Sequence, residues 1–181
     1  MRRVCVPLAE GFEEIEALTV VDVLRRASLE VKTAALKGPE VAGAHGVVVK
    51  ADTDLDQALS AEWDCVVLPG GMPGSTNLRD DPRVGKLLQK TVQAGGLVAA
   101  ICAAPIALAR YGLLEGKKAT SYPGFAEQMP GAQYREERVV KDKGVVTSRG
   151  PGTAMEFALA LVEELAGAEK ASELKEQLLA R

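Results

Sequence analysis

A thiol stands at the end of an apolar run in the middle of the chain. Residues 97–101 lead directly into Cys102, and small residues with Pro105 then open a helix-like pattern, in the stretch LVAAICAAPIALARYG. A strand, a nucleophile-type residue and a helix form the layout of a nucleophile elbow, with Ala100 and Ala104 at the usual glycine positions. Unpaired N–H groups at a helix N-terminus favour a thiolate and lower its pKa. The position predicts a reactive thiol, although a small buried hydrophobe is an equally good interpretation.

The other two cysteines and the one histidine narrow the chemistry. Cys5 and Cys65 lie inside apolar runs, where a cysteine behaves as a small buried hydrophobe. Three widely spaced cysteines without a CxxC pair argue against a disulfide scaffold and a cysteine zinc site, so we expect reduced thiols. A Cys–His pair of the protease or amidotransferase type would need His45. One histidine cannot build a catalytic zinc site alone, so the sequence predicts no metal and no cofactor.

Acidic residues and glycines follow other strand-like runs. Glu13, Glu14 and Glu16 open a helical pattern, where a solvated first turn is the simplest explanation. Since positions i and i+3 share a helix face, one of them could also point inward. An inward carboxylate beside a thiolate would hold its proton and serve as a general acid or base. Gly70 and Gly71 after VVLP form either a tight turn or a source of amide donors for an oxyanion.

Apolar, β-branched runs alternate with helical patterns along the chain. Strands are expected near the runs RVCVPLA, EVKTAAL, GVVVK, DCVVLPGG and GLVAAIC, and residues 138–148 are expected to form a hairpin. Helices are expected over 13–27, from the Asp81 cap to about residue 94, from a Thr153/Glu156 capping box onward, and over 168–179. Continuous apolar strands that alternate with helices predict a mostly parallel sheet inside a three-layer α/β/α sandwich, in one domain over residues 1–181.

Composition excludes several classes of function. The chain has 181 residues, a net charge of −3 and no clustered Lys or Arg, so nucleic acid is not an expected partner. No apolar stretch approaches the roughly 20 residues of a membrane span, and no signal peptide precedes the first strand-like run. We therefore expect a cytoplasmic protein that makes no membrane contact. No glycine-rich stretch has the spacing of a P-loop or a dinucleotide fingerprint, so nucleotide binding has little support.

Four separated motifs resemble one known family. LAEGFEEIEA, VVLPGGMPGS, AAICAAP and TSRGPGTAMEFALA occur in the order found in the ThiJ/PfpI superfamily, and the sequence resembles most the branch of the parkinsonism-associated protein deglycase (DJ-one) and its YajL-like relatives. The likeness runs over essentially the full length. It implies a single flavodoxin-like domain of the class I glutamine amidotransferase-like type, no cofactor, and a homodimer whose interface lies beside the active site.

The resemblance also assigns roles to individual residues. It implies that Cys102 is the oxidisable nucleophile, that Glu16 is a protonated glutamate hydrogen-bonded to it, and that the backbone amides of Gly71 and Ala103 form the oxyanion site. Further matches to positions around the pocket or the dimer interface are Arg26, His45, Tyr122, Arg149, Gly150 and Pro151.

The sequence departs from the family pattern at three of these places. Tyr122 stands where many members have a histidine, and a phenol with an ordinary pKa near 10 is a poor base at neutral pH. Ala103 stands where the PfpI peptidases have a histidine directly after the cysteine, which argues against peptidase activity. His45 replaces an arginine of the human-type proteins, so a different preference for anions is expected in the pocket.

The resemblance and the residues together lead to three hypotheses about function. The first is a cysteine-dependent glyoxalase or deglycase that acts on methylglyoxal, glyoxal or early glycation adducts and protects against carbonyl and oxidative stress. The second is a non-catalytic redox sensor or chaperone in which peroxide oxidises Cys102 to a sulfinate. The third and least favoured is a PfpI-type cysteine peptidase.

Overall fold

The computed structural model describes residues 1–180. Its strands are β1 (Arg3–Leu8), β2 (Glu30–Ala35), β3 (Glu40–Ala42), β4 (Val48–Lys50), β5 (Thr53–Asp54), β6 (Cys65–Leu68), β7 (Leu97–Ile101), β8 (Lys118–Ala119), β9 (Gln133–Tyr134), β10 (Val139–Asp142) and β11 (Val145–Ser148). Its α-helices are α1 (Glu14–Arg26), α2 (Leu55–Ser60), α3 (Gly74–Asp80), α4 (Pro82–Gln93), α5 (Pro105–Arg110), α6 (Ala154–Ala166) and α7 (Ala168–Gln177). Two short 3-10 helices are η1 (Ala126–Gln128) and η2 (Pro151–Thr153).

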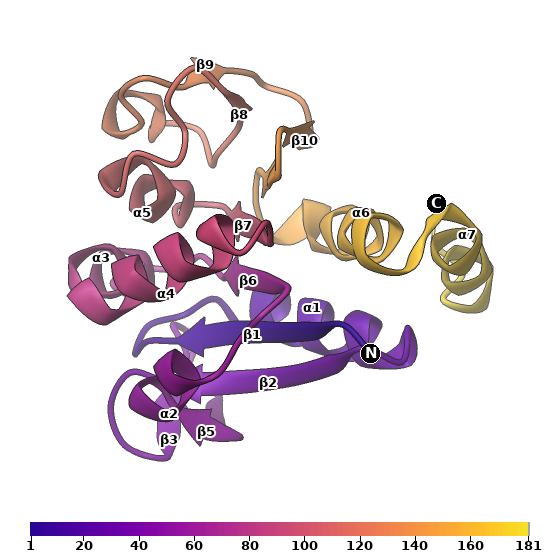
Figure 1. Ribbon diagram of the computed structural model, residues 1–181, viewed down its shortest axis with the longest axis horizontal. Helices are drawn as coiled ribbons and strands as arrows, with labels where there is room; N and C mark the ends of the chain where they lie inside the picture. Colours follow the sequence, from indigo (N-terminus) through magenta and orange to yellow (C-terminus); the bar gives the residue numbers. More distant parts are fainter. Residues whose placement is uncertain (181) are drawn as a thin grey trace.

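A seven-stranded sheet forms the centre of the molecule. Its strand order is β10-β11-β7-β6-β1-β2-β5, and only β10 runs antiparallel to its neighbour. One apolar core packs α1 and α6 against one face of the sheet, and a second packs α2, α4 and α5 against the other face, as Figure 1 shows. The three-layer α/β/α sandwich with a mostly parallel, flavodoxin-like sheet is therefore confirmed, as is the hairpin of β10 and β11.

Local sequence signals place most helix ends correctly. The Asp81 carboxylate accepts a hydrogen bond from the backbone N of Arg83 and caps α4, with Pro82 in the first helical position, as the sequence predicts. α1 likewise ends at the expected Arg25 and Arg26. Within residues 1–180, the longest helices, α1 and α6, have 13 residues each, too few to cross a bilayer, which takes about 20.

One expectation about local structure is wrong, and one expected strand lies outside the central sheet. The strand in the run GVVVK forms as β4, but it pairs with β3 in a separate antiparallel hairpin in which Val41 alone is buried. The capping box at the start of α6 does not form, because the Thr153 hydroxyl bonds the Ser148 hydroxyl at 2.6 Å and the Gly150 carbonyl at 2.9 Å. Glu156 instead forms an ion pair with Arg138. The capping box fails because Thr153 and Glu156 have other polar partners, which the local pattern does not reveal.

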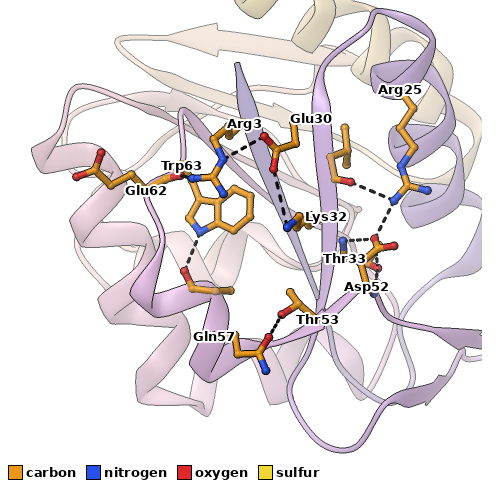
Figure 2. Close-up of polar contacts among 12 residues, drawn as sticks. Arg3, Arg25, Glu30, Lys32, Thr33, Asp52, Thr53, Gln57, Glu62 and Trp63 are labelled. Atoms are coloured by element: carbon orange, nitrogen blue, oxygen red, sulfur yellow. Dashed lines mark hydrogen bonds and ion pairs between the residues drawn. The ribbon is translucent and has the colours of Figure 1, made fainter. Parts of the chain in front are cut away.

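Polar contacts fix the end of α1 against the edge of the sheet (Figure 2). The Asp52 carboxylate accepts hydrogen bonds of 2.8 Å from both the backbone N and the hydroxyl of Thr33 on β2, and of 2.7 Å from Arg25. On the other side of β2, the Arg3 guanidinium lies 4.8 Å from the centre of the Trp63 ring. The bond from Arg25 to Asp52 links the C-terminal end of α1 to β2, whereas the Arg3–Trp63 contact joins β1 to the segment before β6.

Candidate active site

Cys102 occupies a sharp turn directly after β7. Its φ of +63° lies in the left-handed region that L-residues seldom adopt, and its side chain is half-buried. Two backbone hydrogen bonds hold the turn: Cys102 N donates to Ser148 O at 3.0 Å, and Tyr122 N donates to Cys102 O at 2.8 Å. The predicted strand-to-helix turn is confirmed. Ala100 and Ala104, at the glycine positions of the elbow, are fully buried.

The Glu16 side chain enters the same place from the first turn of α1. It has no exposed surface, and its Oε2 accepts a 2.7 Å hydrogen bond from Gly70 N. The carboxyl group also hydrogen-bonds the Cys102 thiol, while Oε1 is buried without a nitrogen or oxygen donor among residues 1–180. Gly70 makes this approach possible: a Cβ there would lie 2.5 Å from Cys102 Cβ and from Glu16 Oε2. The inward carboxylate that the sequence offered as one possibility is Glu16.

Burial keeps a proton on the Glu16 carboxyl. Desolvation raises its pKa from 4.5 to about 7 and the charge of Glu13 adds to this, although the Gly70 amide and the Cys102 thiol oppose the rise. A neutral carboxyl group is therefore well populated at neutral pH. Such a group can donate to sulfur or to an oxyanion and afterwards take a proton back.

The thiol pKa is raised, contrary to the sequence-based expectation. Desolvation and the negative charge of Glu16 raise the pKa of Cys102 to about 12, while backbone amides of Gly71 and Ala103 hydrogen-bond the sulfur and oppose the rise. The helix dipole contributes little, because α5 has only six residues and begins three positions after the cysteine. A proton on Glu16 removes the charge that opposes the thiolate. The protonation state of the thiol thus depends on the protonation state of Glu16.

Replacing Glu16 by glutamine is expected to remove a pH-dependent loss of stability. Because the folded protein holds this proton more tightly than the unfolded chain, wild-type stability should fall as the pH rises from 4.5 to about 7. A pKa rise of this size corresponds to about 3 kcal/mol at most. When urea unfolding is measured between pH 4.5 and 8, the free energy of unfolding of the variant should rise relative to that of the wild type by up to that amount as the pH increases. A constant difference over this range would contradict the protonated carboxyl.

The remaining predicted pocket positions lie partly around the thiol. Gly71, with a φ of +88°, supplies the amide that the sequence suggested. A Cβ on Gly150 would lie 3.2 Å from the Tyr122 ring, so the ring packs over this glycine, and Pro151 follows in η2. The Arg149 guanidinium donates to two backbone oxygens, those of Ser121 and Glu136. The bond from Tyr122 N to Cys102 O joins this group of residues to the turn of the cysteine, and their role in a pocket stays a prediction.

Arg26 is not part of this pocket. It pairs with Asp22 at 2.8 Å on the exposed surface. It also follows Glu16 by ten residues, about 15 Å along the α1 axis. The pocket role is therefore wrong for Arg26, and its place at a dimer interface stays a prediction.

The expectation of a solvated first turn of α1 is wrong. Glu13 and Glu14 are each 7% exposed. The Glu13 carboxylate caps the helix by accepting from Glu16 N at 2.8 Å, and Glu14 accepts from the backbone N and Nδ1 of His45 at 2.7 and 2.9 Å. The covering segment is the loop between β3 and β4, which folds back onto α1. No local motif in the sequence predicts this contact. The only indication is the presence of a single histidine that could pair with the cluster of glutamates.

The two other cysteines are inert by position. Cys5 and Cys65 are fully buried, and burial raises the pKa of both thiols. The interpretation of both as small buried hydrophobes is confirmed. Among the thiols of the chain, Cys102 is the one within reach of solvent.

A separate cavity of about 630 Å³ opens beyond β1 and β2, among residues that include Leu36, Val41 and Arg83, and Cys102 does not line it.

Known proteins are similar to this chain in sequence and in fold. The DJ-1/PfpI family pattern matches residues 2–164. Protein dj-1beta of Drosophila melanogaster is 48% identical over 177 residues, which cover 96% of this chain and 95% of the relative. The glutathione-independent glyoxalase DJR-1.2 of Caenorhabditis elegans is 38% identical over 93% of this chain and 91% of its own. The structure of oxidized Toxoplasma gondii DJ-1 superposes with a TM-score of 0.95 at 42% identity, covering 99% of this chain and 98% of that one. Over nearly its full length, this chain belongs to the DJ-1/PfpI family.

Proposed function

We propose that the protein is a cofactor-independent glyoxalase or deglycase that acts on methylglyoxal, glyoxal or early glycation adducts. The observation that carries the proposal is the hydrogen-bonded pair of Glu16 and Cys102, with the amides of Gly71 and Ala103 on the sulfur. A thiol, a carboxyl group with a pKa near neutrality and two amide donors are the groups that aldehyde addition requires. The glyoxalase name of the Caenorhabditis elegans relative supports the same reaction class.

In the proposed mechanism, the Cys102 sulfur attacks the aldehyde carbon and forms a C–S bond. The thiol proton passes by way of Glu16 to the carbonyl oxygen, which develops its charge beside the amides of Gly71 and Ala103. The Glu16 carboxylate next removes the proton from the former aldehyde carbon and delivers it to the neighbouring carbon, while the hydroxyl proton of the adduct moves to the oxygen of that neighbouring carbon. The first carbon is thereby oxidised to a thioester and the second is reduced to an alcohol. Water then hydrolyses the resulting thioester and releases lactate from methylglyoxal, which leaves the thiol free.

The proposal is tested by product formation without glutathione. The purified protein is incubated with methylglyoxal in the presence of a chelator, and both methylglyoxal and lactate are measured over time. We expect one lactate for each methylglyoxal consumed, at a rate proportional to protein concentration. Consumption without lactate would indicate simple adduct formation with lysine and arginine side chains and would overturn the proposal.

A second candidate function is a peroxide sensor, including the chaperone role that the sequence also suggested. It is favoured by the accessibility of Cys102 beside two amides and a proton donor, which would stabilise a sulfinate, whereas Cys5 and Cys65 are fully buried. Mass spectrometry after mild peroxide treatment should place two added oxygens on Cys102 before either of the other cysteines. Equal oxidation of all three cysteines would count against this function. Peptidase activity gains no such support, since the one histidine is engaged by Glu14.

We further propose a cytoplasmic homodimer. Exposed apolar side chains at Ile15 and Leu18 on α1, and at Val47 and Val48 by β4, lie on two segments joined by contacts of Glu14 with the β3–β4 loop. Apolar surface of this kind is typical of protein interfaces. Light scattering should give twice the mass of the chain, whereas the mass of a single chain would contradict the dimer. The three free cysteines fit a reducing compartment.

A further inference from the structure

A cluster of potential ligand atoms lies beside the thiol site without being part of it. The carboxylates of Glu13 and Glu14 and the imidazole of His45 each offer one atom, and these atoms lie within 4.8 Å of one another. His45 Nδ1 is 2.9 Å from Glu14 Oε2 and 3.9 Å from Glu13 Oε1. Ligand atoms bound to one ion at 2.0 to 2.2 Å stand roughly 3 to 4 Å apart, so small side-chain rotations would bring all three into range.

One carboxylate oxygen of the cluster, that of Glu13, accepts no hydrogen bond in the described residues, whereas Glu14 accepts from the backbone N of His45 and of Val47 and from His45 Nδ1. The Glu13 side chain is only 10% exposed, and its Oε1 accepts no hydrogen bond within residues 1–180, although Oε2 caps α1. This oxygen is directed toward the His45 ring. In the described part of the chain, neither Glu13 nor Glu14 pairs with a lysine or arginine. Two nearly buried carboxylates therefore share one imidazole, and buried charges in proteins are generally paired or bound to metal.

The histidine completes the cluster from a different segment of the chain. His45 is held by its own backbone N, which donates to Glu14 Oε1 at 2.7 Å, while its side chain remains 72% exposed. The backbone bond orients the loop whether or not the ring binds a proton, so the ring nitrogen can exchange its proton for an ion without loss of the loop contact. The exposed ring also leaves a path by which an ion and its remaining water ligands can enter.

We propose that Glu13, Glu14 and His45 form a binding site for a divalent transition-metal ion. One imidazole nitrogen with two carboxylate oxygens suits Zn²⁺ or Cu²⁺ better than Mg²⁺ or Ca²⁺, which prefer oxygen ligands alone. Three protein ligands leave further positions to water. The proposal stands apart from the proposed glyoxalase function, which uses no metal, and each can fail without the other.

The number of histidines makes the site unusually easy to test. The chain contains one histidine, so an imidazole signal from bound Cu²⁺ can come only from His45. The full chain carrying Cys102→Ser, which removes the accessible thiol as a competing ligand, is titrated with Zn²⁺ by calorimetry at pH 7.5 and examined with one equivalent of Cu²⁺ by pulsed electron paramagnetic resonance. We expect a single saturable Zn²⁺ site and one coordinated imidazole on Cu²⁺.

Matched variants separate this site from adventitious binding. His45→Asn and Glu14→Gln, each in the same background, should weaken Zn²⁺ binding at least about tenfold, since even residues that only support a ligand cost that much. His45→Asn should also abolish the imidazole signal. Asp22→Asn removes an exposed carboxylate of the same helix and should leave the affinity unchanged. The proposal is overturned if no saturable binding appears, if the His45 variant binds Zn²⁺ as tightly as its parent, or if Cu²⁺ shows no imidazole.

Discussion

Replacing Cys102 by alanine is expected to lower kcat/KM for methylglyoxal by at least about a thousandfold, as loss of a covalent nucleophile generally does. The side chain supplies the only sulfur that the Glu16 carboxyl and the amides of Gly71 and Ala103 hydrogen-bond in the described residues. Alanine keeps a Cβ in the same left-handed turn, so the backbone and the fold should be preserved. The measurement is lactate formation without glutathione, with far-ultraviolet circular dichroism to verify folding.

Cys5→Ala provides the matched control. This change removes a thiol that is fully buried on β1, so it should lower stability while leaving kcat close to the wild-type value. If Cys102→Ala retained most of the activity, or if Cys5→Ala lost it equally, lactate would not arise through a thiol adduct at Cys102. Residual activity in both variants would point to exposed lysines as the reacting groups.

Replacing Glu16 by glutamine is expected to lower kcat by about 10²- to 10⁴-fold, the usual contribution of a positioned general acid or base. Glutamine can still accept the hydrogen bond from Gly70 N, so the turn at Gly70 should survive. What is lost is the exchangeable proton, together with the carboxylate that takes the substrate proton. The effect should appear in kcat more than in KM, because the carboxyl group transfers protons in the transition state and does not serve mainly to bind the substrate.

The pH profile distinguishes proton transfer from a structural role of Glu16. Wild-type kcat should change with an apparent pKa near the value of about 7 that burial gives Glu16, whereas the glutamine variant should lose that limb. Glu16→Asp keeps the carboxyl group but withdraws it by one methylene. Compared with the glutamine variant, it should recover part of kcat and also the pH dependence of kcat. An unchanged profile in the glutamine variant would remove Glu16 from the chemistry.

Local signals in the sequence were sufficient for the elements that carry the site. Apolar periodicity and caps locate α1 and α4, and the small residues around Cys102 indicate its turn, because each of these features depends on neighbours within a few residues. The parallel sheet then follows from the alternation of strands and helices, and it brings the thiol and the first turn of α1 to the same strand ends.

Features that depend on distant contacts were not predictable in the same way. The β3–β4 loop buries Glu13 and Glu14 by contacts made across some thirty residues, at spacings that no periodic pattern encodes. The raised pKa of Cys102 has the same origin, since it depends on desolvation and on the charge of a residue from another element. A dipole argument from a short helix could not anticipate this balance between burial, a neighbouring charge and two amides.

The left-handed backbone conformation of Cys102 lowers the stability of the fold at the residue that carries the proposed nucleophile. A side chain at a φ of +63° costs about 1 kcal/mol, which glycine would avoid. Substitution of Cys102 by glycine would relieve this strain, but it would also remove a half-buried side chain that packs against the core. The turn by itself therefore gives no reason for a cysteine at this position, and the proposed chemistry of the sulfur supplies one.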